Sequence, residues 1–281
     1  MSRSRLRRAI TGFARYSALV LLATLLVLPI WWLLASSLRP AAEIFRHAGE
    51  IGLAGLWPET ITVEHYTRAF AGELPRAVAN SLFVALSTVL LGVLVCSLAG
   101  FAFAVFDFPF RRTLFAIVLL TFMMPFESIV IPLYVLIRTL GWSNTYWALI
   151  LPEVASGLVV FLFRQFFAGI PKELYEAARV DGASWLAIWA KLTLPLSGPV
   201  VAAASLVLFI HQWDAFFWPL VAAPSAELVT VQVAVARNVT LEVANWGGLF
   251  ASASTAILLA MIPFFLLQRW YVRTVALGSE R

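Results

Sequence analysis

Long apolar runs alternate with shorter polar segments along the chain. Six of these runs approach or exceed the roughly 20 apolar residues that a helix needs to cross a bilayer. Transmembrane β-strands would instead alternate in segments of about 10 residues, and the chain shows no such alternation. The pattern therefore predicts an all-α polytopic membrane protein with six transmembrane helices. They lie at Ser17–Ser36, Ala79–Val105, Leu114–Ile137, Tyr146–Phe167, Leu196–Ala223 and Leu249–Trp270.

The first apolar run follows an arginine-rich segment, an order that a cleaved signal peptide also shows. Arg3, Arg5, Arg7 and Arg8 precede it. Its apolar stretch is longer than the core of about 7–15 residues in a signal peptide, and further runs follow. We therefore expect it to stay in the protein as the first span, with cleavage as the alternative.

Composition and charge agree with a membrane protein, and the positions of the basic residues predict its orientation. The 281 residues are 62% hydrophobic and 12% charged, against about 25% charged in soluble domains. Fourteen of the basic residues fall on the side of the N-terminus and six on the other side. The positive-inside rule then places both chain ends in the cytoplasm. The net charge of +5 reflects this topology and does not indicate nucleic-acid binding, and the lone Cys96 excludes an intramolecular disulfide.

The order of spans and loops divides the chain into three parts. Residues 1–78 hold the N-terminal segment, the first span and a long outer segment. Residues 79–270 hold a five-helix core with an inner loop at 168–195, and residues 271–281 form a tail. In the last outer connection, we expect a short helix around Val229–Arg237.

The inner loop at 168–195 is polar among apolar neighbours, and its residues predict two short helices joined at a glycine. Pro171 suits a first helical position, where its missing N–H has no helical partner anyway. Glu173 and Glu176 suit the positive end of the same helix. Gly182 can end that helix in the left-handed conformation, and Ser184 can cap the next one.

The first of these helices has small residues on one face. Leu174, Ala177, Ala178 and Asp181 follow the spacing i, i+3, i+4, i+7, and the two alanines permit close approach of another surface. Spacing alone leaves two interpretations open. The loop can lie on lipid headgroups with its apolar face buried, or it can form a docking surface for a soluble partner.

The residues of the loop also resemble a known motif. Glu176-Ala177-Ala178, Asp181-Gly182-Ala183 and Leu194-Pro195 are similar to the EAA motif of permease subunits in binding-protein-dependent ABC importers. Nearly the whole chain resembles the carbohydrate-uptake permeases related to the maltose transporter's second membrane subunit. Each further match is short, but their order within the predicted topology is specific, and it favours the docking surface. The matches are Asn80-Ser81-Leu82, Ile131-Pro132-Leu133-Tyr134, Asn144-Thr145-Tyr146-Trp147, Leu151-Pro152, Arg164-Gln165-Phe166-Phe167, Trp218-Pro219-Leu220 and Gln268-Arg269-Trp270-Tyr271-Val272-Arg273.

This resemblance implies a type I ABC importer permease fold and a role for the loop. Its first helix would be a coupling helix that sits in a groove of an ATPase subunit. Glu176 and Asp181 would make polar contacts, Ala177 and Ala178 would form the packing face, and Gly182 would be the elbow.

The resemblance also implies the partners and the location. A homologous second permease, two ATPase subunits and an extracytoplasmic solute-binding protein would complete the importer in the plasma (inner) membrane of a bacterium or archaeon. The chain has no GxxxxGK[ST] phosphate loop, so the ATPase subunits would bind ATP and Mg. We expect no cofactor in this chain and no catalytic activity of its own.

Ionisable residues inside the predicted spans are candidates for the substrate pathway, because such groups are costly in a membrane and commonly face a cavity. Glu127, Glu153 and Asp214 lie within spans or near their ends, and Trp213 adds an aromatic face beside Asp214. The acids at 127 and 153 and the order His211-Gln212-Trp213-Asp214 depart from the family pattern. Each acid can instead be a neutral or paired structural group.

The expected solute is a sugar or an oligosaccharide, and three alternatives stay open. Glycerol-phosphate importers share this type of permease. An ion-coupled secondary transporter would use Glu127, Glu153 and Asp214 as proton or cation sites. An intramembrane enzyme would need a reactive cluster, and the three histidines are scattered without a metal-binding motif such as HExxH.

Overall fold

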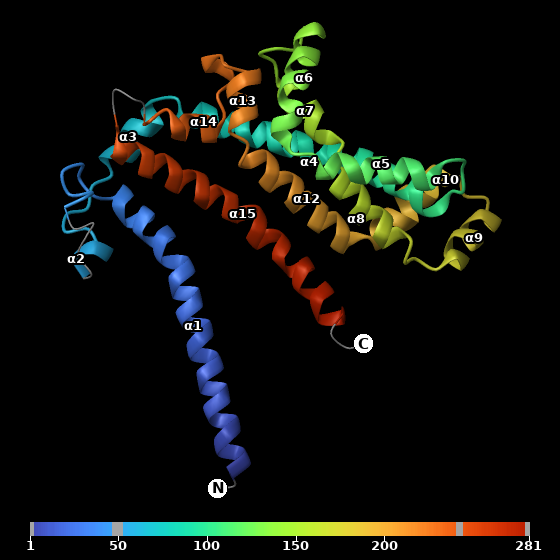
Figure 1. Cartoon of the computed structure of the whole chain (residues 1–281), viewed down its shortest axis with the longest axis horizontal. Coiled ribbons are helices and arrows are strands. Elements are labelled where there is room, and N and C mark those ends of the chain that lie inside the picture. Colours follow the sequence, from blue (N-terminus) through green and yellow to red (C-terminus); the bar gives the residue numbers. More distant parts are fainter. Residues whose placement is uncertain (1–2, 47–52, 240–243, 279–281) are drawn as a thin grey trace. The chain divides into compact units, whose positions relative to one another are not determined.

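The computed structural model describes residues 3–46, 53–239 and 244–278, and these residues are almost entirely helical (Figure 1). The first half of the chain holds α1 (Arg3–Ser37), α2 (Leu53–Leu56), α3 (Glu64–Ala71), α4 (Leu74–Val105), α5 (Arg111–Met123) and α6 (Phe126–Thr139). The second half holds α7 (Tyr146–Val154), α8 (Gly157–Phe167), α9 (Lys172–Val180), α10 (Trp185–Ile188), η1 (Trp189–Thr193), α11 (Leu194–Leu196), α12 (Gly198–Trp213), α13 (Phe217–Ala222), η2 (Ala226–Leu228), α14 (Val231–Ala236) and α15 (Trp246–Gly278).

Length and hydropathy identify the membrane-crossing helices. Within the described residues, four segments are long and apolar enough to cross a bilayer: Gly12–Ser37, Leu74–Val105, Tyr146–Phe167 and Trp246–Leu266. Two further pairs of helices meet the same criterion together, although each pair is bent at a short break. Counting each bent pair as one span gives six. The predicted all-α, six-span class is confirmed on that count.

The third predicted span, Leu114–Ile137, was expected as one helix, and this is wrong. The structure has two helices here, α5 and α6, that meet at an angle of 101°. The break falls at Met124, whose backbone is extended (ψ 128°), immediately before Pro125. A proline ring disfavours the helical conformation of the residue before it, and proline has no N–H to continue the helix.

The fifth predicted span, Leu196–Ala223, also needs correction. The helical run Trp185–Leu196 ends at Ser197, and α12 continues from Gly198 at an angle of 85°. At its far end α12 stops at Trp213. Residues 217–222 form the separate helix α13. The predicted span was too long because the apolar composition of the sequence continues past the end of α12.

The chain folds into two compact units. The first comprises Met1–Gly72 and Val235–Thr255, and the second comprises Glu73–Ala234 and Ala256–Arg281. The division into residues 1–78, 79–270 and 271–281 stays a prediction. Both candidate sites described below lie in the second unit.

Buried polar groups organise the first unit. Arg39 is buried and donates hydrogen bonds to the carbonyl oxygens of Gly55 at 2.9 Å and Trp57 at 3.2 Å. The imidazole Nε2 of the buried His65 lies 2.9 Å from the carbonyl oxygen of Arg39. Gly247 packs directly on that imidazole, because a Cβ built there would lie 2.1 Å from the ring. Hydrogen bonds of buried polar groups thus connect α3 with the segment between α1 and α3.

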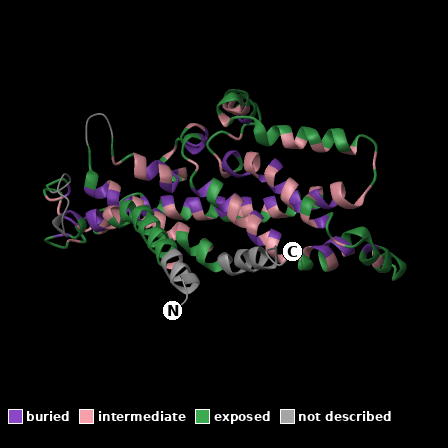
Figure 2. Cartoon of the chain, turned by 60° about the horizontal axis from the view of Figure 1, so that its bottom comes forward, coloured by how far each residue is buried: buried purple, intermediate pink, exposed green. Residues whose placement is uncertain are grey.

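The core of the second unit lies where α4, α8 and α12 pack against one another (Figures 1 and 2). Val159 and Phe163 on α8 are fully buried in it, beside Cys96 of α4. Gly100 permits the close approach of the two helices, since a Cβ there would lie 2.6 Å from the Cβ of Phe163. In Figure 2 the buried residues follow the inner sides of these helices.

The start of α4 is joined to the segment between α13 and α14. The Asn80 amide donates to the carbonyl oxygens of Glu227 and Val229, both at 2.8 Å. The hydroxyl of Ser81 accepts a hydrogen bond from the backbone N–H of Val231 at 2.8 Å. The short helix expected around Val229–Arg237 is confirmed as α14.

Candidate functional sites

The two predicted helices of the inner loop are present, and we call residues 172–196 the elbow. The first helix, α9, ends at Val180, and Gly182 follows it with a φ of +82°. This left-handed backbone is the conformation predicted for Gly182 at the end of the helix. Ser184 caps the second helix, since its hydroxyl accepts a hydrogen bond from the backbone N–H of Ala187 at 3.2 Å. Pro171 lies at the N-cap, one position before the expected one.

The inner corner of the elbow encloses a groove of about 500 Å³. Four of the five residues that the resemblance assigned to ATPase coupling, Ala177, Ala178, Asp181 and Gly182, line this groove. Glu176 is exposed on α9 and does not line it. Val180 at the end of α9 has an exposed fraction of 88%. The groove thus combines small side chains with one carboxylate, Asp181, and one ammonium group, Lys191. The contact roles of these residues stay predictions.

Aromatic contacts hold the elbow in place. Tyr175 is buried in the same apolar cluster as Phe167, and its hydroxyl donates to the carbonyl oxygen of that residue at 3.4 Å. Burial raises the pKa of the Tyr175 phenol, so the side chain stays neutral. Across the turn, the guanidinium of Arg179 lies 5.0 Å from the ring centre of Trp185 and donates to the carbonyl oxygen of Ala183 at 2.7 Å. Neither contact was predicted for the site, although Tyr175 and Trp185 are evident in the sequence of the loop.

The elbow continues into the membrane through an irregular helix. Residues Trp189–Thr193 form a π-helical turn between α10 and α11. Ile188 and Trp189 are buried in the same apolar cluster as Phe163 of α8. The elbow is therefore connected to α8 through packed side chains as well as through the chain.

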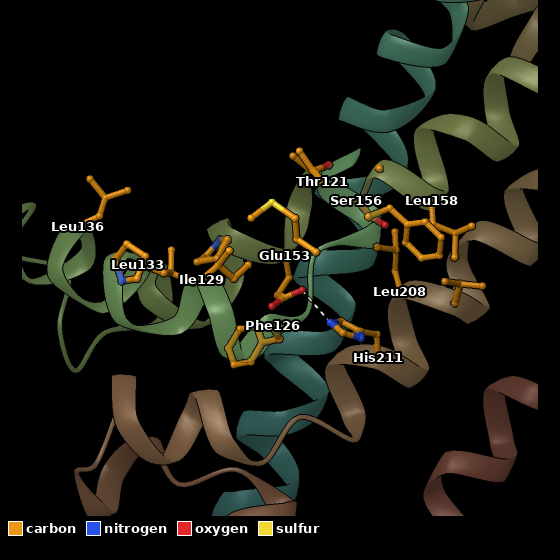
Figure 3. Close-up of a pocket in the computed structure, with 17 residues that line it drawn as sticks. Thr121, Phe126, Ile129, Leu133, Leu136, Glu153, Ser156, Leu158, Leu208 and His211 are labelled. Carbon is orange, nitrogen blue, oxygen red and sulfur yellow. Dashed lines mark ion pairs between the residues drawn. The ribbon is translucent and has the colours of Figure 1, made fainter. Parts of the chain in front are cut away.

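The second candidate site lies at a break between α7 and α8. Ala155 and Ser156 are non-helical, and Ser156 caps α8 through a hydrogen bond from the N–H of Val159 at 3.5 Å. The thiol of Cys96 donates to the carbonyl oxygen of Val154 at 3.3 Å. The break lines a cavity of about 620 Å³, which we call the break cavity (Figure 3). Its walls come from α5, α6, α7, α8 and α12.

An ion pair lies in this cavity. The carboxylate of Glu153 on α7 lies 2.9 Å from Nε2 of His211 on α12 (Figure 3). Both residues also line a neighbouring cavity of about 580 Å³, which we call the aromatic cavity. Asp214 lines the aromatic cavity as well and accepts a hydrogen bond from the side-chain amide of Gln232 at 3.4 Å. The other walls include Phe126, Phe216, Phe217 and Trp218.

The structure brings together two of the four residues predicted for the substrate pathway. Glu153 and Asp214 share the aromatic cavity. Glu127 is exposed on α6, and it lines neither the break cavity nor the aromatic cavity. Trp213 has an exposed fraction of 2% and stacks on Phe209 at a ring distance of 5.5 Å. The sequence marked His211 as an ionisable residue in a span, but its pairing with a residue 58 positions away had no sequence signal.

In the part of the chain that the structure describes, no three His, Cys, Asp or Glu side chains gather closely enough to hold a metal ion. The carboxylates and the imidazole can donate and accept hydrogen bonds beside aromatic rings. This arrangement is suited to binding a polar solute.

Comparison with known proteins gives a consistent result. The family model described as "Binding-protein-dependent transport system inner membrane component" matches residues 92–277. The arabinooligosaccharides transport system permease protein AraQ of Halalkalibacterium halodurans is 35% identical over 263 residues, which cover 92% of this chain and 93% of the relative. The sn-glycerol-3-phosphate transport system permease protein UgpE of Rhizobium meliloti is 33% identical, with coverage of 95% and 96%. The lactose transport system permease protein LacG of Rhizobium radiobacter is 31% identical, with coverage of 98% of each chain.

Two solved structures share the fold. A chain from a bacterial ABC transporter involved in the import of the acidic polysaccharide alginate superposes with a TM-score of 0.82 at 23% identity, covering 96% of this chain and 99% of that one. A chain from a bacterial alginate ABC transporter in complex with an alginate pentasaccharide-bound periplasmic protein gives a TM-score of 0.61 at 18% identity, with coverage of 95% and 96%. At these identities the likeness concerns the fold.

Proposed function

The chain belongs to the family of binding-protein-dependent transport system inner membrane components, and from that membership we propose that it carries a sugar or an oligosaccharide across the membrane. It is a multi-pass permease subunit of an ABC importer and not a catalytic protein. The relatives named for arabinooligosaccharides and lactose support a saccharide as the solute. The relative named for sn-glycerol-3-phosphate makes glycerol phosphate the second candidate.

The ATPase subunits dock at the elbow in this proposal. The groove is lined by Ala177, Ala178 and Gly182, whose small side chains permit a partner helix or loop to approach the backbone closely. Asp181 in the groove and the exposed Glu176 on α9 offer polar contacts to basic groups of a partner, and Lys191 in the groove offers one to an acidic group. The exposed side chain of Val180 adds an apolar contact.

The complete importer consists of this chain, a homologous second permease, two ATPase subunits and an extracytoplasmic solute-binding protein. The solved relative in complex with a periplasmic protein supports the last of these partners. The excess of basic residues on the side of the elbow supports cytoplasmic positions for the elbow and both termini. ATP and Mg are bound by the ATPase subunits, since the sequence has no phosphate-binding loop of its own.

Transport then proceeds by alternating access. Closure of the ATPase subunits moves the elbow, and the helical run Trp185–Leu196 passes that movement to α12, to which it is joined at Ser197. The two cavities lie partly on α12, so its movement changes their access to either side of the membrane. Hydrolysis returns the elbow to its resting position.

ATP-driven uptake in reconstituted vesicles tests this proposal. Vesicles that contain this chain, the second permease and the ATPase subunits are expected to accumulate a saccharide only when the binding protein is outside and ATP is inside. Vesicles without the ATPase subunits, energised by a proton or sodium gradient, are the control. Uptake in those control vesicles would contradict the ABC mechanism and favour an ion-coupled transporter.

A further inference from the structure

We propose that the break cavity and the aromatic cavity form a solute-binding site on this subunit that accepts neutral saccharide units and disfavours anionic solutes. This inference rests on the proposed import of sugars, and it limits the transported sugars to uncharged ones. In this site the Glu153–His211 pair and Asp214 contact the solute, whereas Glu127 and Trp213 do not.

The break between α7 and α8 indicates that the break cavity is hydrated. Residues 155 and 156 lie between two helices that together form one membrane-crossing segment. Non-helical backbone at membrane depth is tolerated where it is buried in protein or lines a water-filled cavity. Here Ala155, which is exposed, and Ser156 line the cavity together with Glu153. Broken membrane helices are also where transporters commonly bind their solutes.

The charges around the two cavities select against anions. Glu153 and Asp214 supply two carboxylates, and His211 supplies at most one positive charge. With both carboxylates ionised, the net charge is negative in either protonation state of the imidazole. Neither set of cavity walls includes an arginine or a lysine in the part of the chain that the structure describes. A phosphate or uronate group would therefore meet like charge at short range, where such repulsion is strong.

The remaining walls suit a saccharide. Ligand sites combine mostly apolar and aromatic walls with a few polar groups that fix the ligand's orientation. Phe126, Phe216 and Phe217 provide the apolar rings, and the Trp218 indole is held by a hydrogen bond to the carbonyl oxygen of Ala148 at 2.9 Å. Carboxylates accept hydrogen bonds from hydroxyl groups, and these charge-assisted bonds are stronger than neutral ones.

Equilibrium binding to the purified complex of this chain with its second permease and ATPase subunits tests the site without the selectivity of the binding protein. The radiolabelled probes are arabinotriose and lactose as neutral solutes, and sn-glycerol-3-phosphate and an alginate trisaccharide as anions. We expect at least one neutral probe to bind about tenfold or more tightly than either anion. Glu153→Gln and Asp214→Asn should each weaken that binding about tenfold, the usual effect of losing a hydrogen bond to a charged group.

Glu227→Gln is the matched control, because Glu227 is an exposed carboxylate of the same unit that lines neither cavity. It should bind the neutral probe as the wild type does. Co-purification of the ATPase subunits reports whether each variant is folded. If Glu153→Gln fails that check, Asp214→Asn provides the test, because an asparagine oxygen can still accept the 3.4 Å hydrogen bond from Gln232.

Unchanged binding of the neutral probe by folded variants would overturn the inference, and so would tighter binding of an anion by the wild type. Parallel uptake measurements separate the two proposals. A wild-type importer that accumulates the alginate trisaccharide with ATP contradicts only the neutral charge class. A complex that accumulates glycerol phosphate and none of the three saccharide probes contradicts sugar import itself.

Discussion

Asn80 uses both ends of its side-chain amide to join segments that are far apart in the sequence. Its nitrogen donates to two carbonyl oxygens, those of Glu227 and Val229. Its oxygen accepts from the hydroxyl of Tyr146 at 2.7 Å. Because Asn80 is buried, these groups have few alternative partners in water. One residue thus connects α4, α7 and the segment before α14.

Asn80→Ala is therefore expected to destabilise the chain by about 2–3 kcal/mol, because buried polar groups lose their partners. The midpoint of denaturation of the purified protein in detergent measures the effect. Gln165→Ala is the control, since it removes an exposed amide on α8 and should change stability by less than about 0.5 kcal/mol. Equal midpoints for the two variants would show that the Asn80 contacts contribute nothing measurable.

At the scale of elements, the elbow depends on the backbone of one residue. Gly182 has a φ of +82°, a conformation that costs L-residues roughly 1–2 kcal/mol. Proline cannot adopt it, because its ring holds φ near −65°. The groove lined by Ala177 and Ala178 exists only while this turn keeps α9 and α10 at their present angle.

Gly182→Pro is expected to abolish co-purification of the ATPase subunits while leaving membrane insertion intact, and Gly182→Ala should have an intermediate effect. Glu176→Lys should also weaken co-purification, because it reverses an exposed charge beside the groove. Glu227→Lys, which makes the same change on an exposed residue before α14, is the control. Pull-down from solubilised membranes provides the measurement, and wild-type recovery with both Gly182→Pro and Glu176→Lys would refute the docking role.

Element boundaries also show how far the sequence could predict this structure. Local patterns in the sequence predicted the number of spans, the helix at residues 231–236, the glycine turn and the Ser184 cap. All four features are present in the structure. The bend at Met124 also had a local signal in the following proline, but apolar composition continued across it. The end of α12 at Trp213 also had a local signal in the polar residues His211, Gln212 and Asp214, but the apolar residues after them favoured one continuous span.

The candidate site was harder to predict than the elements. Glu153 and Asp214 were identified because ionisable groups are unusual in a span. The partner of Glu153 could not be found, since the ion pair to His211 depends on how α7 and α12 pack. Trp213 is buried and stacks on Phe209, one turn before it on α12. An aromatic residue next to an acid in sequence therefore lies in a different environment from that acid.

At the scale of the whole molecule, the distribution of basic residues predicts the orientation in the membrane. The chain has one cysteine, Cys96, and its exposed fraction is 0%. A cysteine introduced on the surface is therefore the single accessible thiol. Val63, before α3, and Val180, in the elbow, have exposed fractions of 60% and 88% and fall on opposite sides of the membrane in the proposed topology.

A membrane-impermeant maleimide should label Val63→Cys in intact spheroplasts and Val180→Cys only after permeabilisation. Labelling is read by the mass shift of the chain, and the unmodified protein should stay unlabelled under both conditions. The reverse pattern would invert the proposed orientation. It would also exclude ATPase docking at the elbow from the cytoplasm.

The π-helical turn at Trp189–Thr193 gives the elbow an unusual sensitivity to chain length. Such a turn accommodates one residue more than an α-helical turn. Because that residue is taken up within the turn, deleting it would restore a regular α-helix. Lys191 and Leu192 of the same turn line the groove. A change of chain length here therefore alters the lining of the groove itself, so divergence in this turn is tied to whichever partner the groove contacts.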